Sequence, residues 1–195
     1  MAVFNTFKKT HSWNLFYISI ILYIYPVLNI KYKYPNFIKL ILTYYFVDLL
    51  SGIVHIYLDD YKGNNSFILP HARGFQRHHE DPKEFTTRGI IRVLSEPSIA
   101  VLFLNLINSY FLNLYFLIFT ILVNIVQLTH YQAHCINHKT FGKNTMYIFK
   151  FLQYAHIILP TKAHSKHHDT FDNNFCILNG WANPFLNLCY RLYHN

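Results

Sequence analysis

The sequence has few charged residues, and acidic residues are scarcest. Only 13% of its 195 residues are charged, against roughly 25% in soluble domains. Nine Asp and Glu accompany seventeen Lys and Arg. Magnesium and calcium take oxygen ligands, so a chain this poor in carboxylates is not expected to be built around them. The basic residues alternate with apolar segments and form no continuous stripe, so no nucleic-acid partner is expected.

Cysteine is also rare, and several zinc motifs are missing. Cys135, Cys176 and Cys189 form no C-x-x-C pair and no even set, which excludes a disulfide framework and a zinc ribbon. The H-E-x-x-H motif of zinc hydrolases is absent, because the His79–Glu80 pair has no second histidine three residues further on. A zinc-dependent hydrolase is therefore disfavoured.

Long apolar runs are abundant and predict the fold class. Trp13–Ile30 contains no charge, Phe37–Leu58 contains only Lys39 and Asp48, and Ile99–Gln127 is uncharged but interrupted by polar residues near its middle. A membrane span needs about 20 apolar residues. The pattern predicts an all-α integral membrane bundle of about four spans, the third being short.

The positions of the spans predict which side of the membrane each polar segment occupies. If residues 93–130 cross twice or form a re-entrant hairpin, the segments around 71–79 and 134–168 share one face. Fourteen of the seventeen Lys and Arg then lie on that face, as expected for the cytosolic side. We expect a multi-pass protein, in the endoplasmic reticulum if the cell is eukaryotic.

Two local patterns give boundaries between the spans. Asp81-Pro82-Lys83-Glu84 is typical of a helix start, with an N-cap, a proline in the first turn and a capping-box acid. The apolar stretch Met146–Leu159 is too short to span, so we expect an interfacial helix that Pro160 ends. A domain boundary is placed after residue 36.

Thirteen histidines, more than all acidic residues together, are the main functional signal. Neutral imidazole is the commonest metal-ligating side chain, and spacings of three or four residues put several rings on one helix face. One ion needs three or four ligands, so eight candidates suit two ions. Imidazole suits iron, zinc, copper and nickel alike. The eight candidate ligands are His55, His78, His79, His134, His138, His164, His167 and His168.

Several other residues are weaker candidates. Asp48 and Asp59 share a helix face with His55, where a carboxylate fixes the tautomer of a ligating imidazole. Asp48 has the alternative of holding another polar group, since a carboxylate within a span needs a partner. His71 and His130 are ranked below the eight. The remaining possible metal-site or supporting residues are His156, Asp81, whose alternative is the helix cap, and Asn183, whose alternative is a structural turn.

These motifs resemble, in order, those of the Kua-type lipid desaturases, a family that includes plasmanylethanolamine desaturase. The resemblance covers about residues 45–187, with departures at Ile56 and Ala163, where an aromatic residue and a histidine are usual. The matching runs are Asp48-Leu-Leu-Ser51-Gly52-Ile-Val-His55-(x3)-Asp59, Arg73-Gly-Phe75-Gln-Arg-His78-His79-Glu-Asp81-Pro82, Gln132-Ala-His134-Cys-Ile-Asn-His138, Leu152-Gln153-(x2)-His156-Ile-Ile-Leu159-Pro160-Thr-Lys162-Ala-His164-Ser-Lys-His167-His168, Phe175-Cys176-Ile177 and Gly180-Trp181-(x)-Asn183.

The resemblance implies that residues 37–195 form a membrane lipid desaturase domain. Its implied cofactors are two non-haem iron ions, with O2 as co-substrate and an external electron donor such as cytochrome b5. The implied reaction places a double bond in a phospholipid chain, foremost the vinyl-ether bond of plasmalogens, with no catalytic side chain beyond the metal centre. The alternatives are an acyl desaturase acting on phosphatidylglycerol, a related membrane diiron hydroxylase and, more remotely, a non-enzymatic membrane metal-binding protein.

Overall fold

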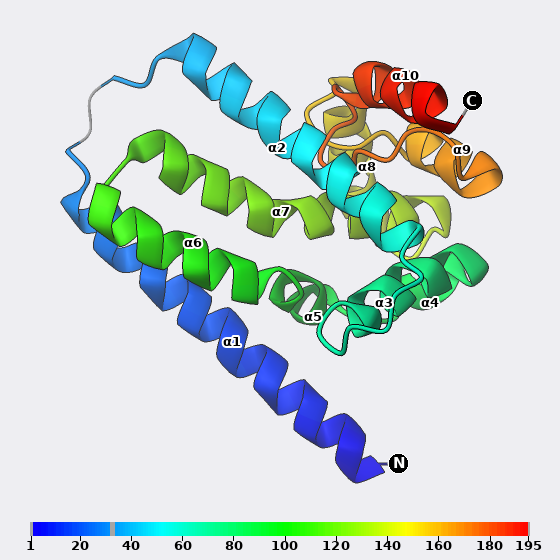
Figure 1. Cartoon of the computed structure of the whole chain (residues 1–195), viewed down its shortest axis with the longest axis horizontal. Coiled ribbons are helices and arrows are strands. Elements are labelled where there is room, and N and C mark those ends of the chain that lie inside the picture. The colour runs from blue at the N-terminus through cyan, green and yellow to red at the C-terminus, as the bar shows by residue number, and fades with distance from the viewer. Residues whose placement is uncertain (1, 32–33, 195) are drawn as a thin grey trace. The chain divides into compact units, whose positions relative to one another are not determined.

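The computed structural model in Figure 1 describes residues 2–31 and 34–194. Every regular element in those ranges is an α-helix, which confirms the all-α prediction. The chain divides into two compact units with boundaries at residues 47/48, 88/89 and 128/129, of which the first and the last fall inside long helices. The helices are α1 (Ala2–Asn29), α2 (Phe37–Asp59), α3 (Leu69–Glu80), α4 (Pro82–Thr86), α5 (Ile90–Ser95), α6 (Ser98–Phe111), α7 (Leu114–Asn137), α8 (Lys143–Tyr154), α9 (Thr161–Thr170) and α10 (Asn183–His194).

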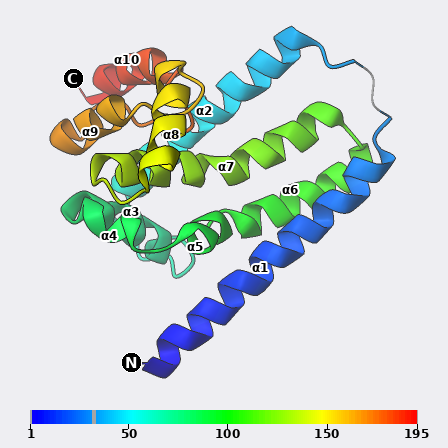
Figure 2. The same cartoon turned by 180° about the vertical axis from the view of Figure 1, so that it is seen from behind.

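Unit 1 comprises Met1–Val47 and Gly89–Leu128 and contains most of the apolar helices. Within it α1 packs against α5 and α6, as Figures 1 and 2 both show. The Tyr23 hydroxyl of α1 donates to the Thr120 carbonyl of α7 at 2.9 Å, and the Asn124 amide donates to that hydroxyl at 3.1 Å. Polar side chains that pair between helices stabilise contacts that apolar packing alone does not specify.

A two-residue turn makes an antiparallel pair from α6 and the first part of α7. Leu112 ends α6 in the left-handed conformation with φ 48°, and the Asn113 side chain accepts from the N–H groups of Tyr115 and Phe116. This cap satisfies the first orphan donors of α7. The apolar run after residue 98 is therefore two helices and a tight turn, as its central polar residues suggest.

Two of the apolar helices, α2 and α7, have the features of membrane-facing segments. α2 and α7 are long and apolar enough to cross a bilayer, whereas Phe16–Asn29 of α1 and all of α6 are apolar but shorter. Only 22% of the apolar window of α2 and 39% of that of α7 is buried, whereas a soluble core helix is mostly buried. Exposed side chains such as Leu28 and Leu42 suit contact with lipid.

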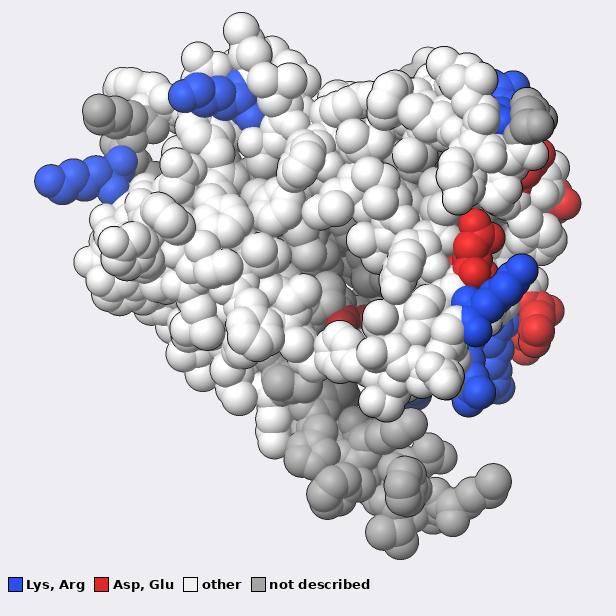
Figure 3. Space-filling view, viewed as in Figure 1, with Lys and Arg blue, Asp and Glu red and all other residues white. Residues whose placement is uncertain are grey.

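Unit 2 comprises Asp48–Arg88 and Thr129–Asn195 and is far more polar. Figure 3 shows charged side chains grouped around α3 and α4, where Arg73, Arg77 and Lys83 are exposed. Asp81 caps α4 by accepting from the Glu84 N–H at 3.3 Å, and Pro82 lies in the first turn. The predicted helix start at this position is confirmed.

The predicted end of the helix before Pro160 is wrong. α8 ends at Tyr154, and His156 takes a left-handed φ of 53°. Gln153 explains the early stop, because its buried amide donates to the Leu159 carbonyl at 2.8 Å and accepts from the Thr161 hydroxyl at 3.0 Å. These bonds fold the chain back before the proline, which instead precedes α9.

One close approach in unit 2 requires glycine. A Cβ added at Gly52 of α2 would lie 2.5 Å from Leu186 Cδ2 and 2.7 Å from Cys176 Sγ. We predict that Gly52→Ala lowers the free energy of unfolding by about 1–3 kcal/mol through overpacking, despite the better helix propensity of alanine. Thermal unfolding in detergent measures the change.

Gly74→Ala is the matched control, because Gly74 is also within a helix and an added Cβ there would meet nothing within 4 Å. It should leave the unfolding midpoint unchanged or raise it. Equal midpoints for the two variants would contradict the packing assigned to Gly52.

Candidate metal centre

Unit 2 gathers nine metal-ligating side chains into two adjacent clusters. The five-histidine cluster is His78, His130, His134, His164 and His168, and the aspartate cluster is His55, Asp59, His79 and His167. Within each cluster one ligating atom per residue lies within 4.8 Å of all the others. The side chains come from α2, α3, α7 and α9, so four helices must pack before either cluster forms.

Helical geometry explains how each helix supplies its ligands. His130 and His134, His164 and His168, and His55 and Asp59 are pairs four residues apart, and each pair serves one cluster. Residues four apart lie on one helix face. Adjacent side chains on a helix point about 100° apart, so each of the two histidine doublets, His78–His79 and His167–His168, is divided between the clusters. His78 and His168 join the five-histidine cluster, while His79 and His167 join the aspartate cluster.

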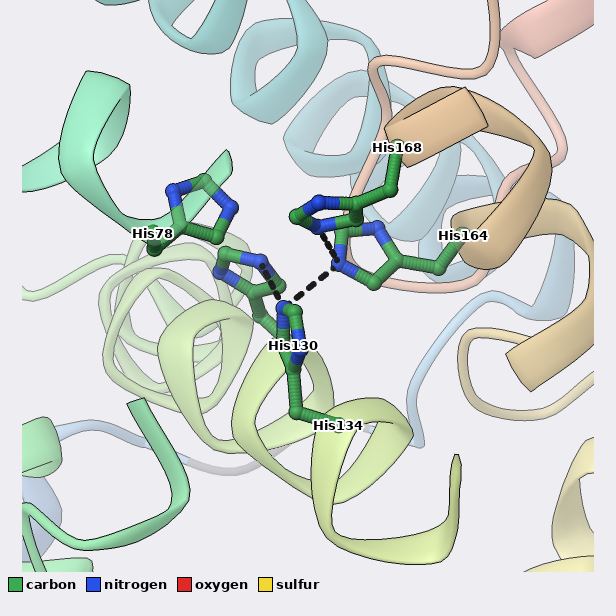
Figure 4. Close-up of side chains that lie close together, drawn as sticks. All are labelled: His78, His130, His134, His164 and His168. Atoms are coloured by element: carbon green, nitrogen blue, oxygen red, sulfur yellow. Dashed lines mark hydrogen bonds between the residues drawn. The ribbon is translucent and has the colours of Figure 1, made fainter. Parts of the chain in front are cut away.

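In the five-histidine cluster the ring nitrogens converge, as Figure 4 shows. The Nε2 atom of His134 lies 3.2 Å from that of His130 and 2.8 Å from that of His164, which lies 3.0 Å from that of His168. A neutral imidazole nitrogen holds either a proton or a lone pair, so one Nε2 cannot donate to two neighbours. Two nitrogens bound at right angles to one ion, each about 2.1 Å away, would lie about 3 Å apart.

In the aspartate cluster a carboxylate lies among three imidazoles. Asp59 places Oδ1 3.2 Å from His79 Nε2, and Oδ2 3.3 Å from His55 Nε2 and 3.6 Å from His167 Nε2. Asp59 is only 17% exposed and the three rings are nearly or fully buried, so water screens these groups little. Asp59 therefore lies within the cluster, in a position where it could bind an ion, whereas the sequence suggested a supporting role.

Three ligands have their ring orientation fixed by backbone carbonyls. The Nδ1–H of His55 donates to Phe175 O and that of His167 donates to Asn173 O, both at 2.8 Å, and the Nδ1–H of His78 donates to Phe75 O. A carbonyl only accepts, so the proton is on Nδ1 and each Nε2 keeps its lone pair. This is the tautomer that second-shell acceptors impose on metal-ligating histidines.

Burial keeps three of the clustered histidines outside the apolar spans uncharged. Burial lowers the pKa of His78 and of His164 well below 6.5, and neighbouring histidines, first His79 for His78 and His130 for His164, lower it further. Burial, followed by His134, lowers the pKa of His168 to about 2. Neutral rings can bind a cation, which would also relieve the crowding of lone pairs.

The donor set therefore fits metal ions. The buried Nε2 atoms of His55, His78 and His167 make no hydrogen bond, as expected for atoms whose partner is an ion. Five nitrogens in one cluster, and three nitrogens with one carboxylate oxygen in the other, suit divalent transition metals. The set does not by itself distinguish iron from zinc or copper.

Seven of the eight predicted ligands lie in the clusters, and His138 does not. Its ring stacks beside that of His134 with centroids 6.4 Å apart, and it lines a cavity of about 220 Å³ that adjoins the five-histidine cluster. His130, one helical turn before His134 and ranked below the eight in the sequence analysis, lies in the five-histidine cluster. The i, i+4 spacing of His130 and His134 was the available signal.

Apart from Asp59 and His130, the weaker candidates lie outside both clusters. Asp48 accepts three backbone N–H bonds from residues 179–182, and Asn183 accepts from the Cys176 N–H at 2.8 Å. His156 is exposed, with its carbonyl accepting from Asn179, and Asp81 is the cap of α4. His71 is exposed on α3.

Comparison with known proteins links this centre to a family. A family model described as the lipid desaturase domain matches residues 44–194, which include every member of both clusters. No solved structure matches the chain.

Loss of one ligand should weaken one cluster selectively. Binding energies of about 10–16 kcal/mol shared by four ligands give roughly 3 kcal/mol each, or about 100-fold in affinity. We predict that His79→Ala weakens metal binding in the aspartate cluster by about that factor, so that metal retained after chelator challenge falls from two ions per chain towards one. Elemental analysis by mass spectrometry measures this. His71→Ala, on the same helix but outside the clusters, should retain both ions; equal losses would exclude the assignment.

Acid should destabilise the metal-free protein. In the unfolded chain these histidines titrate near pH 6.5, whereas burial holds the folded pKa values of His78, His164 and His168 lower. Below pH 6.5 the unfolded state binds more protons, so each such histidine removes about 1.4 kcal/mol of stability per pH unit down to its folded pKa. Chelated protein should therefore unfold at a markedly lower temperature at pH 5.5 than at pH 7.5. An unchanged midpoint would contradict the burial of neutral rings.

Proposed function

The chain belongs to the lipid desaturase domain family, and on that premise we propose that it is an oxygen-dependent lipid desaturase that introduces a double bond into a phospholipid chain. Family membership supports a desaturase-type oxidoreductase associated with membranes and lipid. The observation that carries the proposal is the pair of buried histidine-rich clusters. Attack on an unactivated C–H bond needs an oxidant that side-chain acids, bases and nucleophiles do not provide.

Two iron ions are the proposed cofactors, one in each cluster, with O2 as co-substrate. When bound, iron supplies the redox chemistry by which O2, two electrons and two protons remove two hydrogens from adjacent carbons and yield two waters. The residues of the chain hold and orient the ligands: carbonyls of residues 75, 173 and 175 fix three rings, and burial keeps bulk water from the centre. The choice of iron rests on the family.

The proposed product is the vinyl-ether bond of plasmalogens, as in plasmanylethanolamine desaturase. The support is the ordered set of Kua-type motifs, which contains most of the ligands as well as the Phe175-Cys176-Ile177 and Gly180-Trp181-(x)-Asn183 runs. An acyl desaturase acting on phosphatidylglycerol is the alternative within the family. A hydroxylase would use the same centre and return a hydroxyl group in place of the second hydrogen abstraction.

The proposed topology follows from the apolar helices. About four spans, α1, α2, α6 and α7, would return the histidine-bearing segments to one face, with residues 1–36 holding the first span and residues 37–195 the desaturase domain. The excess of Lys and Arg on that face supports a cytosolic orientation. The site would then face the cytosol at the endoplasmic reticulum in a eukaryotic cell, where a donor such as cytochrome b5 can supply electrons.

The decisive experiment is expression in cells that lack plasmalogens. The wild-type chain should restore acid-labile vinyl-ether lipids, and His167→Ala should lower them at least about 100-fold, since it removes a ligand of the aspartate cluster. Lipid mass spectrometry measures the products, and His71→Ala serves as the matched control.

Each alternative lipid product would indicate a different activity. New acyl double bonds without vinyl ethers would show that the chain desaturates an acyl substrate and not a plasmalogen precursor. Hydroxylated lipid would favour the hydroxylase. A folded, expressed chain that gives none of these products would refute the proposal.

A further inference from the structure

A buried loop connects the last helix of the metal centre to α10. Residues 171–182, named here the strap, lie between α9 and α10 and contain no helix or strand. Phe175, Cys176, Ile177 and Leu178 are at most 2% exposed, although loops normally run over the surface. A buried loop must find partners for its backbone N–H and C=O groups within the protein.

One face of α2 supplies several of these partners. Asp48 Oδ1 accepts from the N–H groups of Asn179 and Gly180 at 2.9 and 3.0 Å, and its Oδ2 accepts from Ala182 at 2.9 Å. One turn further along, Ser51 Oγ accepts from the Ile177 N–H at 3.1 Å. A carboxylate that accepts three amide bonds in a fully buried position is a rigid, charge-assisted anchor.

The strap in turn holds two ligands of the aspartate cluster. Phe175 O accepts from His55 and Asn173 O accepts from His167, in each case from Nδ1–H at 2.8 Å. The Phe175 ring packs against the His167 ring with centroids 5.0 Å apart. In the five-histidine cluster, by contrast, the short contacts run between the Nε2 atoms of its own rings.

We infer that Asp48 is a positioning residue for the aspartate cluster, which it reaches through the strap. Asp48 and Ser51 set the position of the strap backbone, and its carbonyls then hold His55 and His167 with Nε2 directed at the metal position. The inference rests on the proposed metal centre and adds a residue outside it. Loss of an outer-shell partner typically lowers metal affinity 10–100-fold.

Asp48→Asn is the test variant. The amide has nearly the same shape but offers one acceptor oxygen, and its NH2 group would face at least one backbone N–H donor of the strap. Asp60→Asn is the matched control, because Asp60 is the exposed aspartate beside Asp59 at the end of the same helix. Ser51→Ala is a second, milder variant that removes only the acceptor for Ile177.

The readout is cobalt(II) titration of the full-length, metal-free protein in detergent, followed by absorption spectroscopy. Wild type and Asp60→Asn should bind two ions tightly. Asp48→Asn should bind one ion with wild-type affinity and the second 10–100-fold more weakly, the pattern also expected of His79→Ala. Ser51→Ala should shift the same ion in the same direction by a smaller factor.

Other outcomes would overturn the inference. If Asp48→Asn binds both ions with wild-type affinity, even with a lower unfolding temperature, Asp48 only holds the fold. If both ions are lost equally in Asp48→Asn and in Ser51→Ala, the strap does not act on one cluster. A wild-type chain that binds no cobalt would instead refute the metal centre itself, so the two failures are distinguishable.

Discussion

The structure depends on holding eight histidines, six of them buried, close together with their Nε2 atoms directed at one another. Nitrogen atoms 2.8–3.2 Å apart, without a proton for each contact, repel one another unless a cation lies among them. Burial keeps the rings of His78, His164 and His168 neutral, so this repulsion cannot be exchanged for solvated charge near neutral pH. Metal binding would therefore also contribute to the folding free energy of unit 2, because the unfolded chain has no preformed site.

The second requirement is that the orientation of each ring be fixed by a hydrogen bond from its Nδ1–H. Backbone carbonyls do this for His55, His78 and His167, and two of those carbonyls belong to the strap. A backbone acceptor is fixed only as well as the loop that contains it. The buried carboxylate of Asp48 and the close approach at Gly52 are thus explained together, since both bring α2 against the strap.

Sequence reasoning reached the helices, the lipid desaturase family and most of the clustered residues, because these follow from local periodicity and from motifs. It failed where a contact between residues far apart in the sequence determines the position of a side chain or the end of a helix. His130 and His138 are equally spaced from His134, and only the packing of α3, α7 and α9 places the first in a cluster and the second at a cavity. In the same way, α8 ends early because Gln153 bonds to Leu159 and Thr161, and Asp48 holds a loop more than a hundred residues away. None of these partners is visible in a short window of sequence.

The two histidine doublets show why the clusters cannot be independent. His78 and His79 are neighbours on α3, with ring centroids 4.3 Å apart, yet they serve different clusters, and His167 and His168 do the same on α9. A rotation of either helix that improves one cluster must move a ligand of the other. Adjacent side chains on a helix are separated by about 100°, so two sites served by one doublet must also be close in space. Two metal ions acting on one substrate, as proposed, would need this proximity, which two adjacent residues on one helix can provide.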